Sequence, residues 1–155
     1  MDICGPMIVR VEQVGPVFRE PWQRFGTAVF LFDLTRATAA QPRALFGGHL
    51  VGATIGTACY QAFGDSIGVY VLAQAMALAA MLLTRTVHPL AGANPILMIH
   101  AHATWDSLLQ PVGPGTLSLV LVAMIWSRLY PGLIRYPLDP LAPSPPQINW
   151  GGWGT

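Results

Sequence analysis

The feature that most constrains this chain is a long stretch with almost no charge. Between residues 44 and 127, over 84 residues, the only charged side chains are those of Asp65, Arg85 and Asp106. A soluble domain carries about 25% charged residues, whereas this chain carries 10% and is 53% hydrophobic. Such a stretch cannot supply the surface of a soluble protein. We therefore predict an all-α integral membrane protein, because helices satisfy their own backbone hydrogen bonds in lipid.

Three windows are long and apolar enough to cross a bilayer, which takes about 20 residues for about 30 Å of hydrocarbon. They are residues 44–63, 66–84 and 111–130. Two shorter apolar pieces, 26–34 and 95–109, are too short to cross as straight helices. We expect three clear transmembrane helices plus one or two half-helices or broken spans. Aromatic residues near the window ends are typical of interfacial belts: Tyr60, Tyr70, Trp126 and Tyr130.

The distribution of charge and proline divides the chain into three parts. Residues 1–24 form a polar N-terminal segment, 25–133 form the predicted transmembrane domain, and 134–155 form a Pro/Gly-rich tail that we expect to be extended or disordered. A weak internal repeat is also visible, since GTAV at residue 26 and GANP at residue 92 each precede a Gln-Pro pair and a long apolar window. Interrupted segments at corresponding places in two halves indicate a transporter-type binding site.

Composition and motifs exclude several classes of function. The net charge of +1 provides no field to attract nucleic acid. The chain has no Lys, so it can hold neither a P-loop lysine nor a Schiff base. Two separated cysteines form no zinc or redox motif, and no nucleophile elbow, GxGxxG or paired carboxylates are present. We expect no enzyme activity, no cofactor and no metal.

The densest group of candidate functional residues is TRTVHPLAGANP, residues 84–95. Pro89 lacks a backbone N–H and disfavours helix at the residue before it, so we expect the backbone to break just after His88. We assign this break to Pro89, Gly92 and Pro95. Asn94 before a proline is typical of a helix N-cap. A half-helix starting there would direct its free N–H groups into a cavity.

Arg85 and His88 lie three residues apart and would share a face of the second helix if it extends that far. Together with the helix start at Asn94 they would form a small positive pocket, which suits an anion. Alternatively, Arg85 only extends to the membrane surface and the Pro-Gly-Asn run is a surface turn. His49 lies inside the first window, where it is either part of the site or a hydrogen-bonding residue between helices.

Two further patterns bear on the site. Gly48, Gly52 and Gly56 form a GxxxGxxxG pattern that lets a neighbouring helix approach closely in a membrane. A metal or haem site is the other alternative to an anion site, but its ligands would not share one helical face. Those ligands would be His88, His100, His102 and Asp106.

The blocks QPRALFGGHL at residues 41–50 and TRTVHPLAGANP, with a charge-free helix between them and a PVGPG helix after them, resemble the HPP family of integral membrane proteins. The similarity covers residues 25–133. It implies a four-span fold and, from plant and cyanobacterial relatives, nitrite transport. Here His88-Pro89-Leu90 replaces the family's His-Pro-Pro, and charged residues 1–24 stand where the family has its first span, so we expect a member lacking that span.

We therefore predict a multi-pass protein of the bacterial inner membrane that transports or conducts a small inorganic anion such as nitrite, with homo-oligomer formation. The competing hypothesis is a non-transporting membrane subunit or an inactive truncated member of the family. The candidate substrate-binding residues are Arg85, His88, Asn94, His49 and Arg43. For the arginines to share the cytoplasmic side, residues 86–110 must also cross in a broken form, which places Asp65 outside.

Overall fold

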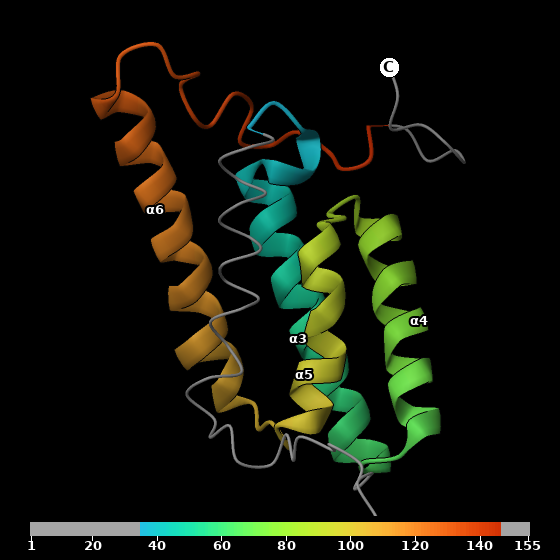
Figure 1. Ribbon diagram of the computed structural model, residues 1–155. Coiled ribbons are helices and arrows are strands. Elements are labelled where there is room, and N and C mark those ends of the chain that lie inside the picture. Colours follow the sequence, from blue (N-terminus) through green and yellow to red (C-terminus); the bar gives the residue numbers. More distant parts are fainter. Residues whose placement is uncertain (1–34, 147–155) are drawn as a thin grey trace, which may run out of the picture.

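The computed structural model describes residues 35–146, which form a bundle of helices around one central helix (Figure 1). The elements in chain order are η2 (Thr38–Ala40), α3 (Pro42–Phe63), α4 (Ile67–Thr84), η3 (Pro89–Ala93), α5 (Asn94–His100), the π-helical turn η4 (Leu108–Val112) and α6 (Gly113–Leu129). The central helix is α3, which packs against α4, α5 and α6. Residues 35–146 contain no β-strand, only an isolated parallel bridge between Thr86 and Ser144.

The chain passes back and forth between two ends of this bundle. At one end, the start of α3 meets the end of α4, because the Arg43 guanidinium donates to the carbonyl of Thr84 at 3.2 Å. At the other end, the turn after α3 meets the segment after α5, because His102 Nε2 lies 3.2 Å from Asp65 Oδ2. The η3–α5 stretch therefore returns the chain along the bundle beside α3 and α4 (Figure 1).

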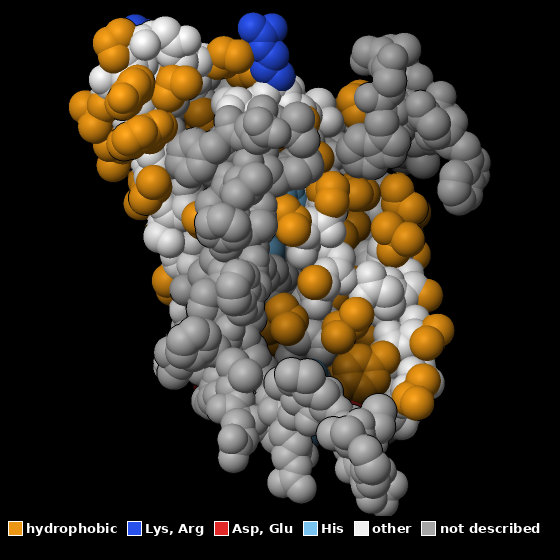
Figure 2. All heavy atoms as spheres, viewed as in Figure 1, with side chains coloured by type: hydrophobic (Ala, Val, Ile, Leu, Met, Phe, Trp, Pro, Cys, Tyr) orange, Lys and Arg blue, Asp and Glu red, His pale blue; other side chains and the backbone are white. Residues whose placement is uncertain are grey.

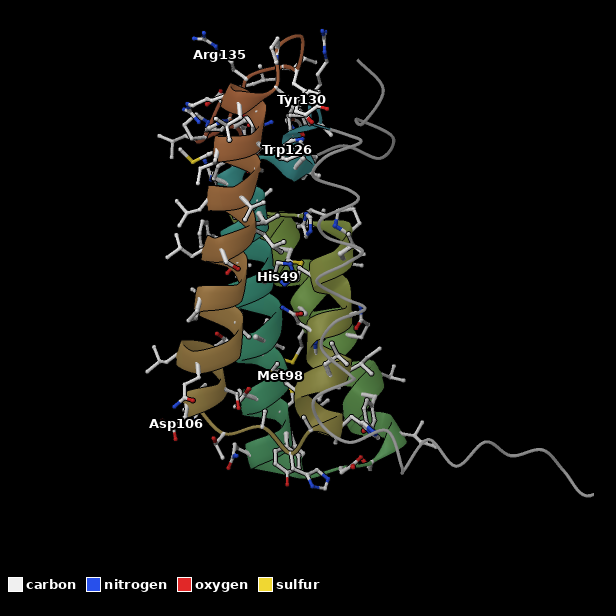
Figure 3. The ribbon with its side chains drawn as sticks, turned by 60° about the vertical axis from the view of Figure 1, so that its left-hand side comes forward. His49, Met98, Asp106, Trp126, Tyr130 and Arg135 are labelled. Carbon is white, nitrogen blue, oxygen red and sulfur yellow. The ribbon has the colours of Figure 1, made fainter. Side chains whose placement is uncertain are left out.

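All arginines of the described part lie at one end, which we call the arginine end: Arg36, Arg43, Arg85, Arg128 and Arg135. The opposite end carries Asp65 and Asp106. Figure 3 shows this separation, with Arg135, Tyr130 and Trp126 at the top and Asp106 at the bottom. The bundle thus has a charge asymmetry along its axis.

The three predicted long helices are all present, but only two qualify as candidate membrane spans. These are Ile67–Thr84 and Leu108–Leu129, in which less than a quarter of the apolar window is buried. Their side chains face outward, and Figure 2 shows apolar side chains over α6 and α4. The Gly-rich helix α3 has 22 residues but is less hydrophobic and more buried. The prediction of three clear spans is therefore not confirmed.

The piece 95–109, expected to be a half-helix or a broken span, is broken: α5 ends after seven residues at His100, and a turn follows in which His102 has a φ of 50°. The helix that restarts at residue 106 continues through η4 into α6. The predicted half-helix 26–34, and with it the first unit of the internal repeat, lies outside the described residues.

The Pro-rich tail is not disordered where the structure describes it. The side chains of Tyr136 and Ser144 are 1% and 0% exposed, and the Tyr136 hydroxyl donates to the carbonyl of Ala40 at 3.0 Å. Proline content predicted an extended or disordered tail; residues 136–145 form no helix or strand and are held by hydrogen bonds to segments distant in sequence. This part of the tail crosses the arginine end of the bundle (Figure 1).

Candidate polar site at the interrupted helix

The backbone break between α4 and η3 lies earlier than the sequence predicts. Arg85 ends α4 in the left-handed conformation, with φ 55° and ψ 47°, and His88 is extended, with φ −124° and ψ 116°. Extended backbone at His88 is what Pro89 requires of the residue before it. Because α4 stops at Thr84, Arg85 and His88 do not share a helical face.

Of the three residues assigned to the break, only Pro89 lies beside it, where it opens η3. Gly92 lies inside η3 and Pro95 in the first turn of α5, and η3 runs directly into α5. A Cβ at Gly92 would meet only the Gln74 amide nitrogen at 3.7 Å, an ordinary contact. No break therefore occurs between Pro89 and His100.

Three polar side chains meet inside the bundle beside this break. His49 from α3, His88 from the break and Asn94 from α5 are 7%, 0% and 2% exposed. The Asn94 amide donates to the His49 carbonyl at 2.8 Å and to His49 Nδ1 at 3.0 Å. The centroids of the two imidazole rings lie 5.3 Å apart. We call His49, His88 and Asn94 the polar cluster; Figure 3 shows His49 at mid-height in the bundle.

Hydrogen bonds define the protonation of both rings. His88 Nδ1 lies 2.8 Å from the carbonyl oxygen of Ala39, and since a carbonyl can only accept, Nδ1 of His88 carries the proton. His49 Nδ1 accepts from Asn94, so in the neutral His49 ring the proton is on Nε2. The polar cluster therefore combines two different neutral tautomers.

The glycines of α3 bring the interrupted segment close to the central helix. A Cβ on Gly48 would lie 2.8 Å from the Thr86 carbonyl, one on Gly52 2.8 Å from the Ala91 carbonyl, and one on Gly56 2.6 Å from Pro95 Cα. Each distance is shorter than a real Cβ contact. The GxxxGxxxG pattern thus faces the break, η3 and α5 rather than another long helix.

Asn94 is not a helix N-cap. It adopts helical φ and ψ of −58° and −44°, and its backbone N–H donates to the carbonyl of Ala91 in η3. Ala93 occupies the cap position and makes no side-chain cap. Because η3 uses the first N–H group of α5, the free helix N-terminus expected at this point is not formed, and the Asn94 side chain is available to bond to α3.

The two candidate arginines lie at the arginine end and bond to the C-terminal segment. Arg85 Nε donates to the carbonyl of Pro145 at 3.2 Å. Arg43 Nη1 donates to the carbonyl of Leu141 at 3.3 Å. These contacts agree with the alternative in which Arg85 reaches the surface of the bundle. The structure thus groups His49, His88 and Asn94, and places Arg85 and Arg43 at one end.

Residues of the C-terminal segment that the sequence did not indicate also surround the site. Burial raises the pKa of the Tyr136 hydroxyl above its ordinary value, so this hydroxyl stays protonated and donates to Ala40. Ser144 bonds to Val87, the residue before His88. Neither residue belongs to a recognisable motif, and nothing in the sequence pattern singles them out.

The histidines proposed for a metal site do not come together. His102 stacks on Tyr60, with ring centroids 5.0 Å apart, and pairs with Asp65 at the end opposite the arginines. His88 lies at the break near the arginine end. Within residues 35–146, no three His, Cys, Asp or Glu side chains form a group that could hold a metal ion.

These features define a class: a helical membrane protein in which the chain is interrupted after α4. The segment after the interruption packs against the central helix α3 and places polar side chains inside the bundle. Comparison with known proteins gives the family. Residues 25–137 match the model of the HPP transmembrane region, and the chain belongs to this family. The resemblance deduced from the QPR and HPxAGANP blocks is thereby confirmed.

A curated relative agrees with this assignment. A transmembrane protein of Dictyostelium discoideum is 31% identical over 107 residues, which are 64% of this chain. The chain spans about a third, 34%, of the length of that relative. No solved structure matches the chain.

Proposed function

We propose that this chain transports a small inorganic anion of the nitrite type across a membrane, with the polar cluster on the transport path. The observation that carries the proposal is the interrupted segment, which places His49, His88 and Asn94 inside the bundle. Polar side chains at membrane depth are costly and mark transport paths, and non-helical backbone there is tolerated where it lines a path or is buried in protein.

The chemistry of the polar cluster suits a singly charged anion. Neutral imidazole and amide N–H groups can donate hydrogen bonds to an anion without the cost of a buried permanent charge. The donors now bond within the protein, Asn94 to His49 and His88 to Ala39. An anion would bind by exchanging with these acceptors, so binding would be weak enough to allow release.

The arginine end supports a negatively charged substrate and an orientation of the protein in the membrane. Arg43 and Arg85 lie at this end, and their positive charge raises the local concentration of anions. Arginines also prefer the cytoplasmic side of a membrane. We place the arginine end in the cytoplasm, and we propose the bacterial inner membrane as the membrane that the chain crosses.

The proposal is tested by nitrite flux into proteoliposomes that contain the full chain. Asn94→Leu keeps the approximate size of the side chain but removes two hydrogen bonds. The loss of about 1.4 kcal/mol or more from such bonds corresponds to a fall in flux of about tenfold. Gln110→Leu is the matched control, since Gln110 is an exposed amide at the opposite end, and it should leave flux unchanged.

A second candidate is a membrane subunit that does not transport. It is favoured by the mutual bonding of His49 and Asn94, which is also what a purely structural hydrogen bond between helices would show. If wild-type proteoliposomes take up no more nitrite than empty liposomes, this candidate replaces transport. Equal flux in wild type and Asn94→Leu would remove the polar cluster from the path.

A further inference from the structure

The C-terminal segment 136–145 bonds to residues adjacent to both partners of the buried hydrogen bond between His88 and Ala39. We call this segment the strap. Tyr136 donates its hydroxyl proton to the carbonyl of Ala40, next to Ala39, at 3.0 Å. Ser144 bonds to Val87, next to His88. Donor and acceptor come from segments 49 residues apart, and the strap connects them.

On the His88 side the strap makes three hydrogen bonds centred on Ser144. The Val87 N–H donates to the Ser144 carbonyl at 2.8 Å, and the Ser144 N–H donates to the Arg85 carbonyl at 2.9 Å. The Ser144 hydroxyl donates to the Val87 carbonyl at 2.7 Å. Residues 85–87, which we call the bridge segment, are thus paired to the strap through the isolated parallel bridge of Thr86 and Ser144.

The other side of this bridge segment packs on α3, which leaves it little freedom. A Cβ on Gly47 would lie 2.5 Å from Thr86 Cγ2, and one on Gly48 would lie 3.0 Å from His88 Cβ. The bridge segment is therefore confined between the glycines of α3 and the strap. The position of the His88 ring follows from both contacts.

On the Ala39 side the strap fixes η2 and the start of α3. Gln41 is 2% exposed, and its Oε1 accepts from the N–H groups of Leu138 and Asp139 at 3.1 and 3.3 Å. The Arg43 N–H donates to the carbonyl of Pro140 at 3.1 Å. With Tyr136 on Ala40, these bonds hold the η2 carbonyls toward the interior of the bundle.

We propose that the strap positions His88, with Tyr136 and Ser144 as positioning residues that hold its ring in the Nδ1-protonated tautomer. Without the strap, Ala39 and His88 are no longer held at bonding distance and the ring samples both tautomers. The proposal concerns the polar cluster of the proposed function, but its test measures the ring itself. If the chain does not transport nitrite, the state of the His88 ring still decides whether this proposal is right.

The experiment is ¹⁵N NMR of the full chain labelled at histidine, in detergent micelles. The chain has four histidines, and the His88 signals are those absent from His88→Gln. In the wild type we expect a protonated Nδ1. Tyr136→Phe and Ser144→Ala each remove one hydroxyl and should shift the His88 nitrogen signals toward the averaged values of two tautomers.

Matched controls are chosen from side chains outside the strap. Tyr130→Phe alters an exposed tyrosine at the same end, and Ser118→Ala removes a hydroxyl that bonds only within α6. Both should leave the His88 signals unchanged. Ser144→Thr retains the hydroxyl and should restore the wild-type signals. Wild-type His88 signals in both Tyr136→Phe and Ser144→Ala, or a protonated Nε2 in the wild type, would overturn the proposal.

Discussion

The closest approach of two helices in the bundle predicts the effect of one added methyl group. In Gly56→Ala the new Cβ would lie 2.6 Å from Pro95 Cα and 2.8 Å from the Pro95 carbonyl oxygen, both backbone atoms. Ordinary contact begins at 3.4 Å, so α5 would have to move by about 0.8 Å, the difference between 2.6 and 3.4 Å. Overpacking of this kind costs about 1–3 kcal/mol.

The same substitution also has a favourable effect that must be subtracted. Replacing Gly by Ala inside a helix stabilises it by about 1 kcal/mol, so Gly56→Ala should lower the free energy of unfolding by up to about 2 kcal/mol. At about 2–4 °C per kcal/mol, the Tm falls by up to about 8 °C. The control is Gly68→Ala in α4, where a Cβ would meet nothing within 4 Å; its Tm should stay the same or rise.

The assay follows the reaction of buried Cys59 with a thiol-reactive dye on heating in detergent. A Cys4→Ser background makes Cys59 the only thiol. The comparison of Gly56→Ala with Gly68→Ala separates close packing from helix propensity, because both gain the same methyl group. If Gly56→Ala is as stable as Gly68→Ala, the close approach of α3 and α5 is refuted.

Three further predictions concern the membrane, its orientation and the arginines. The chain should stay in membranes after a carbonate wash and leave only with detergent, because apolar side chains cover the outer faces of α4 and α6; release by carbonate alone would contradict this. In cysteine-accessibility labelling, Asp65→Cys and Arg135→Cys should react from opposite sides of the membrane, since Asp65 contacts His102 at one end of the bundle and Arg135 lies at the other (Figure 3). Labelling from one side would show that the segment 86–110 does not cross. Nitrite flux should fall in Arg85→Gln and persist in Arg85→Lys. The reason is that Arg85 makes one hydrogen bond to the strap through Nε, so we expect only its positive charge to act on the anion. Equal loss in both variants would instead indicate bidentate binding by the guanidinium.

Local sequence pattern predicted the long helices closely. The window 66–84 corresponds to α4, Ile67–Thr84, with Ser66 as its N-cap, and the window 44–63 corresponds to α3, which ends at Phe63 as predicted. These bounds follow from uninterrupted apolar runs and from the Gly64 that ends α3. Local pattern also predicted that Pro89 interrupts the chain, since the effect of a proline on the preceding residue needs no tertiary contact.

The candidate site was predicted only in part. His88 and Asn94 lie within a few residues of Pro89, and the structure brings both side chains into the polar cluster; their role in binding stays a prediction. The prediction that Asn94 is a helix N-cap was wrong. Because η3 continues directly into α5, the backbone N–H of Asn94 already donates to the carbonyl of Ala91. The expected pocket around Arg85 depended on α4 continuing past Thr84. Arg85 instead adopts the left-handed conformation at the end of α4, and its side chain bonds to the strap.

The sequence by itself determined that the chain is helical, apolar on its surface and interrupted shortly before Pro89, because hydrophobic length and proline act over a few neighbouring residues. Only the tertiary structure decided the partners of the polar groups. Ala39 accepts from a residue 49 positions away, and Ala40 accepts from Tyr136, 96 positions away. A buried N–H or O–H must find an acceptor, but which acceptor lies within 3 Å depends on how distant segments pack, and local pattern carries no information on that.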